Sequence, residues 1–112
     1  MKVLLLGGTG YFGGEIAEYL SKKQCDVVCA IRHGADTKRL EAMNKVKLIL
    51  VENGQIEHTM EEEGIDWVIN STCCYESNHT LYGDMIEANL VFPLNILNMA
   101  AKYKVKNFVT VG

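Results

Sequence analysis

A cluster of glycines near the amino terminus is the feature of this sequence that most directly suggests chemistry. Gly7-Gly8-Thr9-Gly10-Tyr11-Phe12-Gly13 has the spacing G-x-x-G-x-x-G and follows an apolar run, Lys2–Leu6. A tight turn from a strand into a helix needs backbone angles that glycine adopts at low cost. Without a Cβ at Gly10, main-chain N–H groups can approach a pyrophosphate, which the positive end of the helix dipole then faces. Gly13, with Gly14 beside it, lets the helix lie close to the sheet.

The position of these glycines in the chain favours a dinucleotide site. The motif follows a strand and opens an amphipathic helix, which is where such glycines bind a dinucleotide. A glycine-rich turn that holds no ligand is the alternative. A P-loop nucleotide hydrolase is excluded, because no Gly-Lys-Ser or Gly-Lys-Thr follows the glycines.

The elements that must position this turn alternate along the chain between short apolar runs and longer helical patterns. Strands are expected at Lys2–Leu6, Asp26–Ile31, Lys47–Val51, Asp66–Asn70 and Asn107–Val111. Helices are expected along the stripe Phe12, Ile16 and Leu20, at Thr37–Met43, at Ile56–Glu63, and from Asp84 to about Tyr103. Such strands need crossover connections, so the pattern predicts an α/β protein with helices on both faces of a parallel sheet.

The last expected helix has three features of its own. The segment from Asp84 to Glu87 has capping-box chemistry, so the helix should begin at Asp84. Pro93 has no N–H to donate to the carbonyl of Asn89, and it should kink the helix. The buried side of this helix is expected to hold Met85, Leu90, Leu94, Leu97 and Ala101.

Three segments resemble the extended short-chain dehydrogenase/reductase family, the NAD(P)-dependent epimerases and dehydratases. Leu5–Gly13 is similar to the family's T-G-G-x-G-F-I-G signature, and Asp66–Asn70 is similar to its D-x-V-I-H strand. The segment Asn89–Val111 resembles N-x-x-G-T-x-N-L-L-E-A-A-x-x-x-x-V-x-x-F-V-x-x-S, with matches at Asn89, Asn95, Ala100, Val105, Phe108 and Val109. The resemblance covers nearly the whole chain but only the amino-terminal part of the family. It implies a Rossmann-type, doubly wound parallel sheet of five strands in the order 3-2-1-4-5, with three αβα layers.

The resemblance also implies a cofactor and the residues that bind it. The cofactor is NAD or NADP, and the binding residues are Gly7, Gly10, Tyr11, Phe12, Gly13, Arg32, Ser71, Thr72, Cys73 and Asn89. Ser71-Thr72-Cys73 stands where the family has a small Ala-Ala segment, on the nicotinamide side of the cofactor. These small side chains suit a plain turn equally well.

The end of the second strand, Ala30-Ile31-Arg32-His33, bears on the choice between NAD and NADP. NAD-selective sites usually place Asp or Glu there to bind the ribose hydroxyls, and neither is present. Arg32 instead offers a guanidinium for a 2′-phosphate, with His33 beside it, which favours NADP. Alternatively, Arg32 stacks on the adenine or faces water, or Asp36 reaches back to the ribose, and selectivity is then slight.

Hydride transfer in this family requires a Tyr-x-x-x-Lys pair and a Ser or Thr just past the fifth strand. Tyr19 and Lys23 have this spacing, but they lie late in the first helix, far from the strand ends where ligands bind. Tyr75, His79 and Tyr82 are expected in the loop after the fourth strand, near enough to a cofactor to touch it, but His79 has no identifiable partner as a catalytic base. We therefore expect no catalytic residue here and interpret the chain as the NAD(P)-binding, amino-terminal portion of a longer epimerase, dehydratase or reductase acting on a nucleotide sugar. A regulatory or redox-sensing module that binds NADP(H) is the alternative.

Composition limits the remaining possibilities. The formal net charge of −3 gives no general attraction to nucleic acid or to anionic membranes, and no apolar run is long enough to span a membrane. Cys25, Cys29, Cys73 and Cys74 form no Cys-x-x-Cys pair, so buried reduced thiols are expected rather than disulfides or a metal site. We expect a cytoplasmic protein. A hydrophobic fifth strand at the sheet edge further predicts a homodimer formed through that strand.

Overall fold

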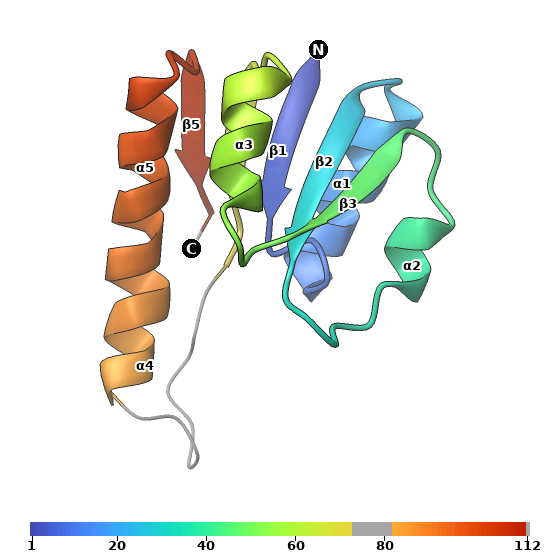
Figure 1. Ribbon diagram of the computed structural model, residues 1–112. Coiled ribbons are helices and arrows are strands. Elements are labelled where there is room, and N and C mark those ends of the chain that lie inside the picture. The colour runs from blue at the N-terminus through green and yellow to red at the C-terminus, as the bar shows by residue number, and fades with distance from the viewer. Residues whose placement is uncertain (73–81, 112) are drawn as a thin grey trace.

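Five short apolar runs form the strands of one parallel sheet. The computed structural model, which describes residues 1–72 and 82–111, has β1 (Lys2–Leu6), β2 (Asp26–Ile31), β3 (Val46–Leu50), β4 (Trp67–Asn70) and β5 (Asn107–Thr110). The strands lie in the order β3-β2-β1-β4-β5, and every neighbouring pair is parallel (Figure 1). This confirms the predicted Rossmann-type fold and strand order, with strand bounds that differ from the predicted ones by at most one residue.

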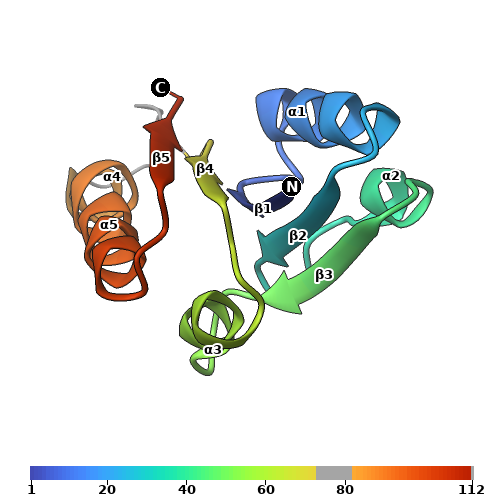
Figure 2. The same ribbon diagram turned by 90° about the horizontal axis from the view of Figure 1, so that it is seen from above.

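Helices cover both faces of the sheet. On one face lie α1 (Tyr11–Lys22) and the short α2 (Lys38–Glu41) (Figure 2). On the other face lie α3 (Gln55–Glu62) and a long helix made of α4 (Tyr82–Ile86), the π-helical turn η1 (Glu87–Val91) and α5 (Phe92–Lys102). In the part of the chain that is described, none of these helices is both long and apolar enough to cross a lipid bilayer.

Strand β1 lies in the middle of the sheet, which explains why its residues are continuously apolar. Leu4 and Leu6 pack with residues of α3 and α5 on one face, whereas Leu5 packs with residues of α1 and α2 on the other. All three leucines are at most 1% exposed. Burying one such side chain stabilises the fold by ~1.5–3 kcal/mol. The core therefore holds the carboxyl end of β1, and the turn that follows it, firmly in place.

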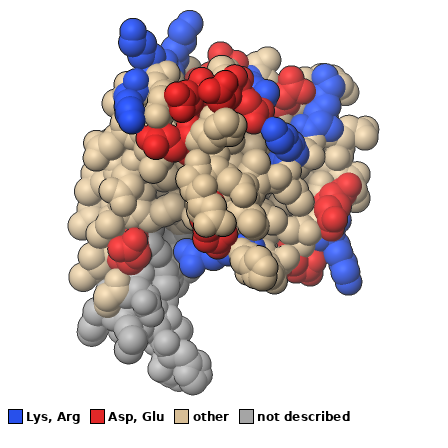
Figure 3. All heavy atoms as spheres, viewed as in Figure 1, with Lys and Arg blue, Asp and Glu red and all other residues tan. Residues whose placement is uncertain are grey.

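The long helix buries a different face from the one predicted. Ile96 and Ala100 lie in the core, and Phe92 packs against it. Leu90 and Leu94 are 55% and 49% exposed. Leu97 and Ala101 are also exposed, while Met85 is half-buried, so the predicted buried stripe is wrong. In Figure 3, the flank of the molecule formed by α5 carries few charged side chains. The helix is apolar on two sides, and only contact with the sheet decides which side is buried.

The start of the long helix differs from expectation, and its proline lies beside a π-helical turn. The helix begins at Tyr82, so Asp84 lies inside it and is not its N-cap. Pro93 is the second residue of α5, directly after the π-helical turn η1. In that turn the N–H of Phe92 donates to the carbonyl of Glu87, five residues back. The helix thus accommodates the proline with a wider turn before it and continues on both sides (Figure 1).

Candidate functional site

The candidate site lies at the carboxyl ends of β1, β2 and β4, beside the first turn of α1. The chain leaves β1 toward β2 and β3, and it later returns to the other side of β1 as β4. Open α/β sheets bind ligands at such a reversal of strand order. The predicted glycine turn joins β1 to α1 at this position (Figure 1).

Gly7 and Gly13 are required by the packing of the turn itself. Gly7 has a φ of +86°, and a Cβ there would lie 2.8 Å from Ser71 Oγ and 2.9 Å from the backbone nitrogen of Thr72. A Cβ at Gly13 would lie only 1.9 Å from the carbonyl oxygen of Gly7. The first turn of α1 therefore touches the end of β1 directly. This agrees with the close helix packing predicted at Gly13 and with the glycine backbone angles predicted for the turn.

Gly10 differs from them, because no described residue fills the space beside it. A Cβ there would meet only the carbonyl oxygen of Gly7, at an ordinary contact distance of 3.5 Å. Gly10 is exposed and is the N-cap of α1, and it has no side chain to cap the helix. The N–H groups of a first helical turn have no carbonyl partner inside the helix and carry partial positive charge. Such an open helix end can accept an anionic group such as a diphosphate.

The residues after β4 close the side of the turn next to Gly7. The hydroxyl of Ser71 donates to the carbonyl oxygen of Leu6 at 2.9 Å and to that of Gly7 at 3.3 Å. Thr72 donates its N–H to Asn70 Oδ1 at 3.1 Å, and its hydroxyl donates to the same oxygen. Asn70 is fully buried, and its Nδ2 has no hydrogen-bond partner among the described residues. Both predicted cofactor ligands thus use their hydroxyls within the protein, and Ser71 fastens β4 to the glycine turn.

Two exposed aromatic rings stand at the first turn of α1. Tyr11 is 76% and Phe12 is 64% exposed, and the rings meet edge to face with centroids 5.5 Å apart. The prediction that Phe12 belongs to the buried stripe of this helix is wrong. Helix α1 instead buries small residues, among them Gly13, Ala17 and Ser21, because a close approach to β1 leaves no room for larger ones. Both rings therefore remain accessible beside the glycine turn.

The ends of β2 and β3 bring together charged residues from separate parts of the chain. Arg32 and His33 follow β2 and are exposed. Asp36, the predicted alternative ribose ligand, accepts the N–H of Lys38 through Oδ1 at 3.1 Å. Glu52 follows β3, and its Oε1 accepts the N–H of His33 at 3.4 Å. Glu52 was not among the predicted site residues, although the predicted pairing of the second and third strands places the residues after both strands at the same edge of the sheet.

Comparison with known proteins agrees with this geometry. The sequence pattern of the NAD dependent epimerase/dehydratase family matches residues 3–112. The chain belongs to this family. Its membership confirms the resemblance that the glycine turn, the fourth strand and the last helix and strand indicated.

Several solved structures share the fold of this family member at low sequence identity. UDP-glucose 4-epimerase from Bifidobacterium longum, in complex with NAD+ and UDP, matches with a TM-score of 0.82 and 22% identity, over 100% of this chain and 37% of that one. The Bordetella bronchiseptica enzyme WbmH, in complex with NAD+, matches with a TM-score of 0.80 and 20% identity, over 96% of this chain and 37% of that one. Yeast methylglyoxal/isovaleraldehyde reductase Gre2, complexed with NADPH, matches with a TM-score of 0.80 and 18% identity, over 98% of this chain and 36% of that one. This chain therefore spans little more than a third of each of these proteins.

The other residues singled out in the epimerase-family sequence lie in different parts of the fold. Asn89, a predicted cofactor ligand, is exposed in η1 on the long helix after the site. Tyr19 lies late in α1, and the Nζ of Lys23 lies 5.6 Å from the centroid of its ring. This end of α1 is at the amino end of the sheet, which supports the interpretation of the Tyr-x-x-x-Lys spacing as chance. Cys73, Tyr75 and His79 lie outside the described residues.

Two cysteines are buried, and one of them, Cys29, lies beneath the glycine turn. Cys25 and Cys29 are free and buried, in agreement with the predicted buried thiols. Burial raises the pKa of the Cys29 thiol to about 12, so this thiol stays protonated. Its Sγ atom would lie 3.1 Å from a Cβ at Gly8, which gives that glycine a packing role. Cys74, like Cys73, lies outside the described residues.

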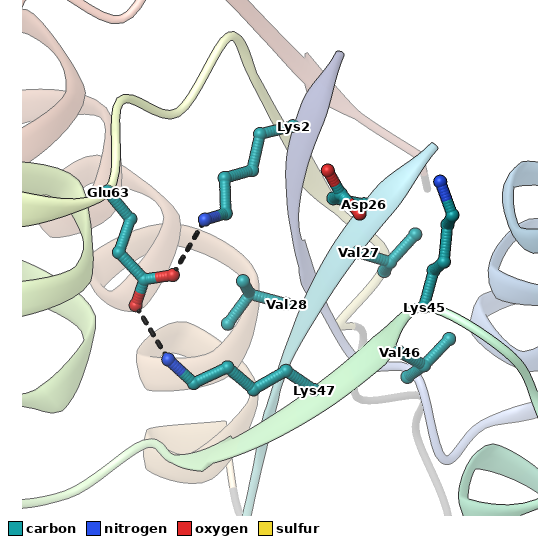
Figure 4. A pocket seen from close by; sticks show the side chains of 8 residues that line it. All are labelled: Lys2, Asp26, Val27, Val28, Lys45, Val46, Lys47 and Glu63. Carbon is teal, nitrogen blue, oxygen red and sulfur yellow. Dashed lines mark hydrogen bonds and ion pairs between the residues drawn. The ribbon is translucent and has the colours of Figure 1, made fainter. Parts of the chain in front are cut away.

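A separate hollow of about 290 Å³ lies at the opposite, amino end of the sheet. Its charged lining consists of Lys2, Asp26, Lys45, Lys47 and Glu63 (Figure 4). The Nζ atoms of Lys2 and Lys47 each lie 2.9 Å from a carboxylate oxygen of Glu63. Hydrogen bonds from the two lysines hold the pKa of Glu63 below its ordinary value, and the bond from Lys2 has the larger effect. This cluster ties β1 and β3 to the end of α3, and it lies away from the glycine turn.

Proposed function

We propose that this chain binds a nicotinamide dinucleotide, NAD or NADP, with the diphosphate on the main-chain N–H groups at the start of α1. The contrast among the glycines supports this proposal best. Gly7 and Gly13 are required by contacts within the protein, whereas the space beside Gly10 is filled by no described residue. A glycine turn that served packing alone would not need glycine at Gly10. An anionic ligand that approaches the main chain does need it.

The other predicted site residues take their proposed roles from their positions. Tyr11 and Phe12 flank the diphosphate, and Arg32 attracts the 2′-phosphate of NADP. Ser71 acts by shaping the turn, since its hydroxyl is already engaged with the main chain. The nicotinamide side is assigned to Thr72 and Asn89 and, from the family resemblance alone, to Cys73, which lies outside the described residues.

For the whole protein, we extend the proposal to a nucleotide-sugar epimerase, dehydratase or reductase in which residues 1–112 form the dinucleotide-binding domain. The Bifidobacterium longum relative is complexed with UDP as well as NAD+, which supports a nucleotide-sugar substrate. A bound nicotinamide dinucleotide supplies hydride chemistry, and this chain holds and orients it. A cytoplasmic location is part of the proposal, as is a homodimer of the 112-residue chain formed through β5, an edge strand among the described residues. Light scattering during size-exclusion chromatography measures the oligomeric state.

Titration of the purified chain with NADH and NADPH, followed by coenzyme fluorescence and calorimetry, tests the proposal. We expect both coenzymes to bind at submillimolar concentration. Arg32→Ala should weaken NADPH binding about tenfold or more, the size of one charged hydrogen bond, and should affect NADH less. Lys38→Ala removes a nearby exposed charge from α2 and is the matched control. Absence of binding by either coenzyme at millimolar concentration would overturn the assignment.

A further inference from the structure

The charges beside Arg32 suggest a second determinant of coenzyme choice. We infer that Glu52, at the end of β3, supplies the carboxylate that the end of β2 lacks and disfavours a 2′-phosphate on the adenine ribose. Glu52 thereby opposes Arg32, and the two side chains together set the preference between NAD and NADP. This inference rests on the proposed dinucleotide site and assigns its selectivity to a residue from a different strand.

The pairing of β2 with β3 brings Glu52 to this position. Ile31, the last residue of β2, pairs with Leu50, the last residue of β3. The N–H of Val51 then donates to the carbonyl oxygen of Ile31 at 2.9 Å, which extends the pairing by one step. One residue further along, the Glu52 carboxylate accepts the N–H of His33 at 3.4 Å. The carboxylate therefore lies at the main chain of the residue that directly follows Arg32.

The position of this carboxylate suits the edge where the adenine ribose binds in dinucleotide folds. In these folds an acidic group at the end of the second strand accepts hydrogen bonds from the ribose hydroxyls. Glu52 is exposed and reaches the same strand end from its neighbour, so it presents negative charge there. A 2′-phosphate carries negative charge and is repelled by it, whereas the 2′-hydroxyl of NAD can donate to it.

Two further charged groups near this edge are engaged elsewhere. Arg39 Nη2 lies 2.7 Å from Glu15 and 2.9 Å from Glu18, so its guanidinium is held on α1. These two carboxylates raise the pKa of Arg39 by accepting its hydrogen bonds, and the bond to Glu15 has the larger effect. The Oδ1 atom of Asp36 is occupied by the N–H of Lys38. Arg32 and Glu52 are the two opposed charges at the paired ends of β2 and β3, and we assign the ribose to them.

Measuring dissociation constants for NADH and NADPH with wild type, Glu52→Gln and Arg32→Ala tests the inference. Glu52→Gln keeps the shape and the hydrogen-bond acceptor but removes the charge. It should raise the affinity for NADPH relative to NADH about tenfold, and Arg32→Ala should shift the same ratio in the opposite direction. The effect of Glu52→Gln should shrink in roughly 0.5 M salt to about a third or less, because screening weakens charge interactions at exposed sites.

The control is Glu61→Gln, which removes an exposed carboxylate from α3 without touching this edge. It should leave the ratio of the two affinities unchanged. A change of less than about twofold in Glu52→Gln, with both coenzymes still bound, would overturn this inference and leave the proposed function standing. Failure of the wild-type chain to bind either coenzyme would overturn both.

Discussion

Replacing Gly10 with alanine separates what a ligand requires from what the fold requires. In the folded chain the added Cβ would meet only the carbonyl oxygen of Gly7, at 3.5 Å. Alanine is a poorer N-cap than glycine, but lower flexibility of the unfolded chain offsets this by about 0.4–1 kcal/mol. We therefore expect the free energy of unfolding to change by less than ~0.5 kcal/mol. A pyrophosphate against the same main chain leaves no room for this Cβ, so coenzyme binding should weaken strongly.

The expected loss of binding follows from the contacts at stake. A hydrogen bond from an N–H group to a charged oxygen contributes ~1.5–3 kcal/mol, so losing one raises Kd roughly ten- to a hundredfold. Urea unfolding followed by circular dichroism measures the stability of Gly10→Ala, and NADH and NADPH titrations measure its Kd values. Unchanged Kd values for both coenzymes in the folded variant would refute the reasoning.

Gly13→Ala is the contrasting variant. Its Cβ would lie 1.9 Å from the carbonyl oxygen of Gly7, where real Cβ atoms stay beyond 3.0 Å. The helix or the turn must therefore shift by about 1 Å, and overpacking of this kind costs ~1–3 kcal/mol. Gly13→Ala should lose stability and coenzyme binding together, whereas Gly10→Ala should lose binding alone.

Three further variants test the packing and charges of the fold. Ser71→Ala removes the hydroxyl that binds two main-chain carbonyls and should lower the free energy of unfolding by ~1 kcal/mol in urea; an unchanged value would show that these bonds add nothing. Ile96→Ala, at a core position that is 1% exposed, should cost ~2–5 kcal/mol, and Leu94→Ala, at a position that is 49% exposed, less than ~1 kcal/mol; equal losses would contradict the orientation of α5. Glu63→Gln should cost ~1 kcal/mol at about pH 7. The folded-state pKa of Glu63 is lowered from its ordinary value of 4.5. The ion pairs therefore stabilise the fold fully above pH 4.5, and this stabilisation is lost as the pH falls through the lowered pKa. A difference that does not shrink as the pH is lowered from about 7 toward about 2.5 would contradict the ion-pair mechanism.

The fold could be predicted from the sequence because several local signals agree. The apolar run of β1 is continuous because both of its faces are buried, and glycine follows it where φ is +86° at Gly7. Crossover connections then require a parallel sheet. Each of these signals depends on residues close together in the chain, so spacing alone was sufficient to predict a parallel α/β sheet, whereas the strand order came from the family resemblance.

The buried face of the long helix could not be predicted in the same way. Leu90, Leu94 and Leu97 have helical spacing and apolar side chains, yet they are exposed. Phe92 and Ile96 have equally good spacing and pack on the sheet. Periodicity identifies a face only when the opposite face is polar. The choice here depends on how the helix meets β4 and β5, which is a tertiary contact.

The coenzyme selectivity that we infer depends on a further kind of information, the register between strands. A carboxylate was sought at the end of β2, where dinucleotide sites usually have one, and none follows Ile31 directly. The structure shows a carboxylate from the neighbouring strand at that end, because Ile31 pairs with Leu50 and Glu52 comes two residues later. A shift of one residue in this pairing would move Glu52 along the strand by ~3.3 Å and turn its side chain to the other face. The sequence of either strand alone does not place Glu52 beside His33, so the selectivity that we infer for Glu52 depends on the pairing of β2 with β3.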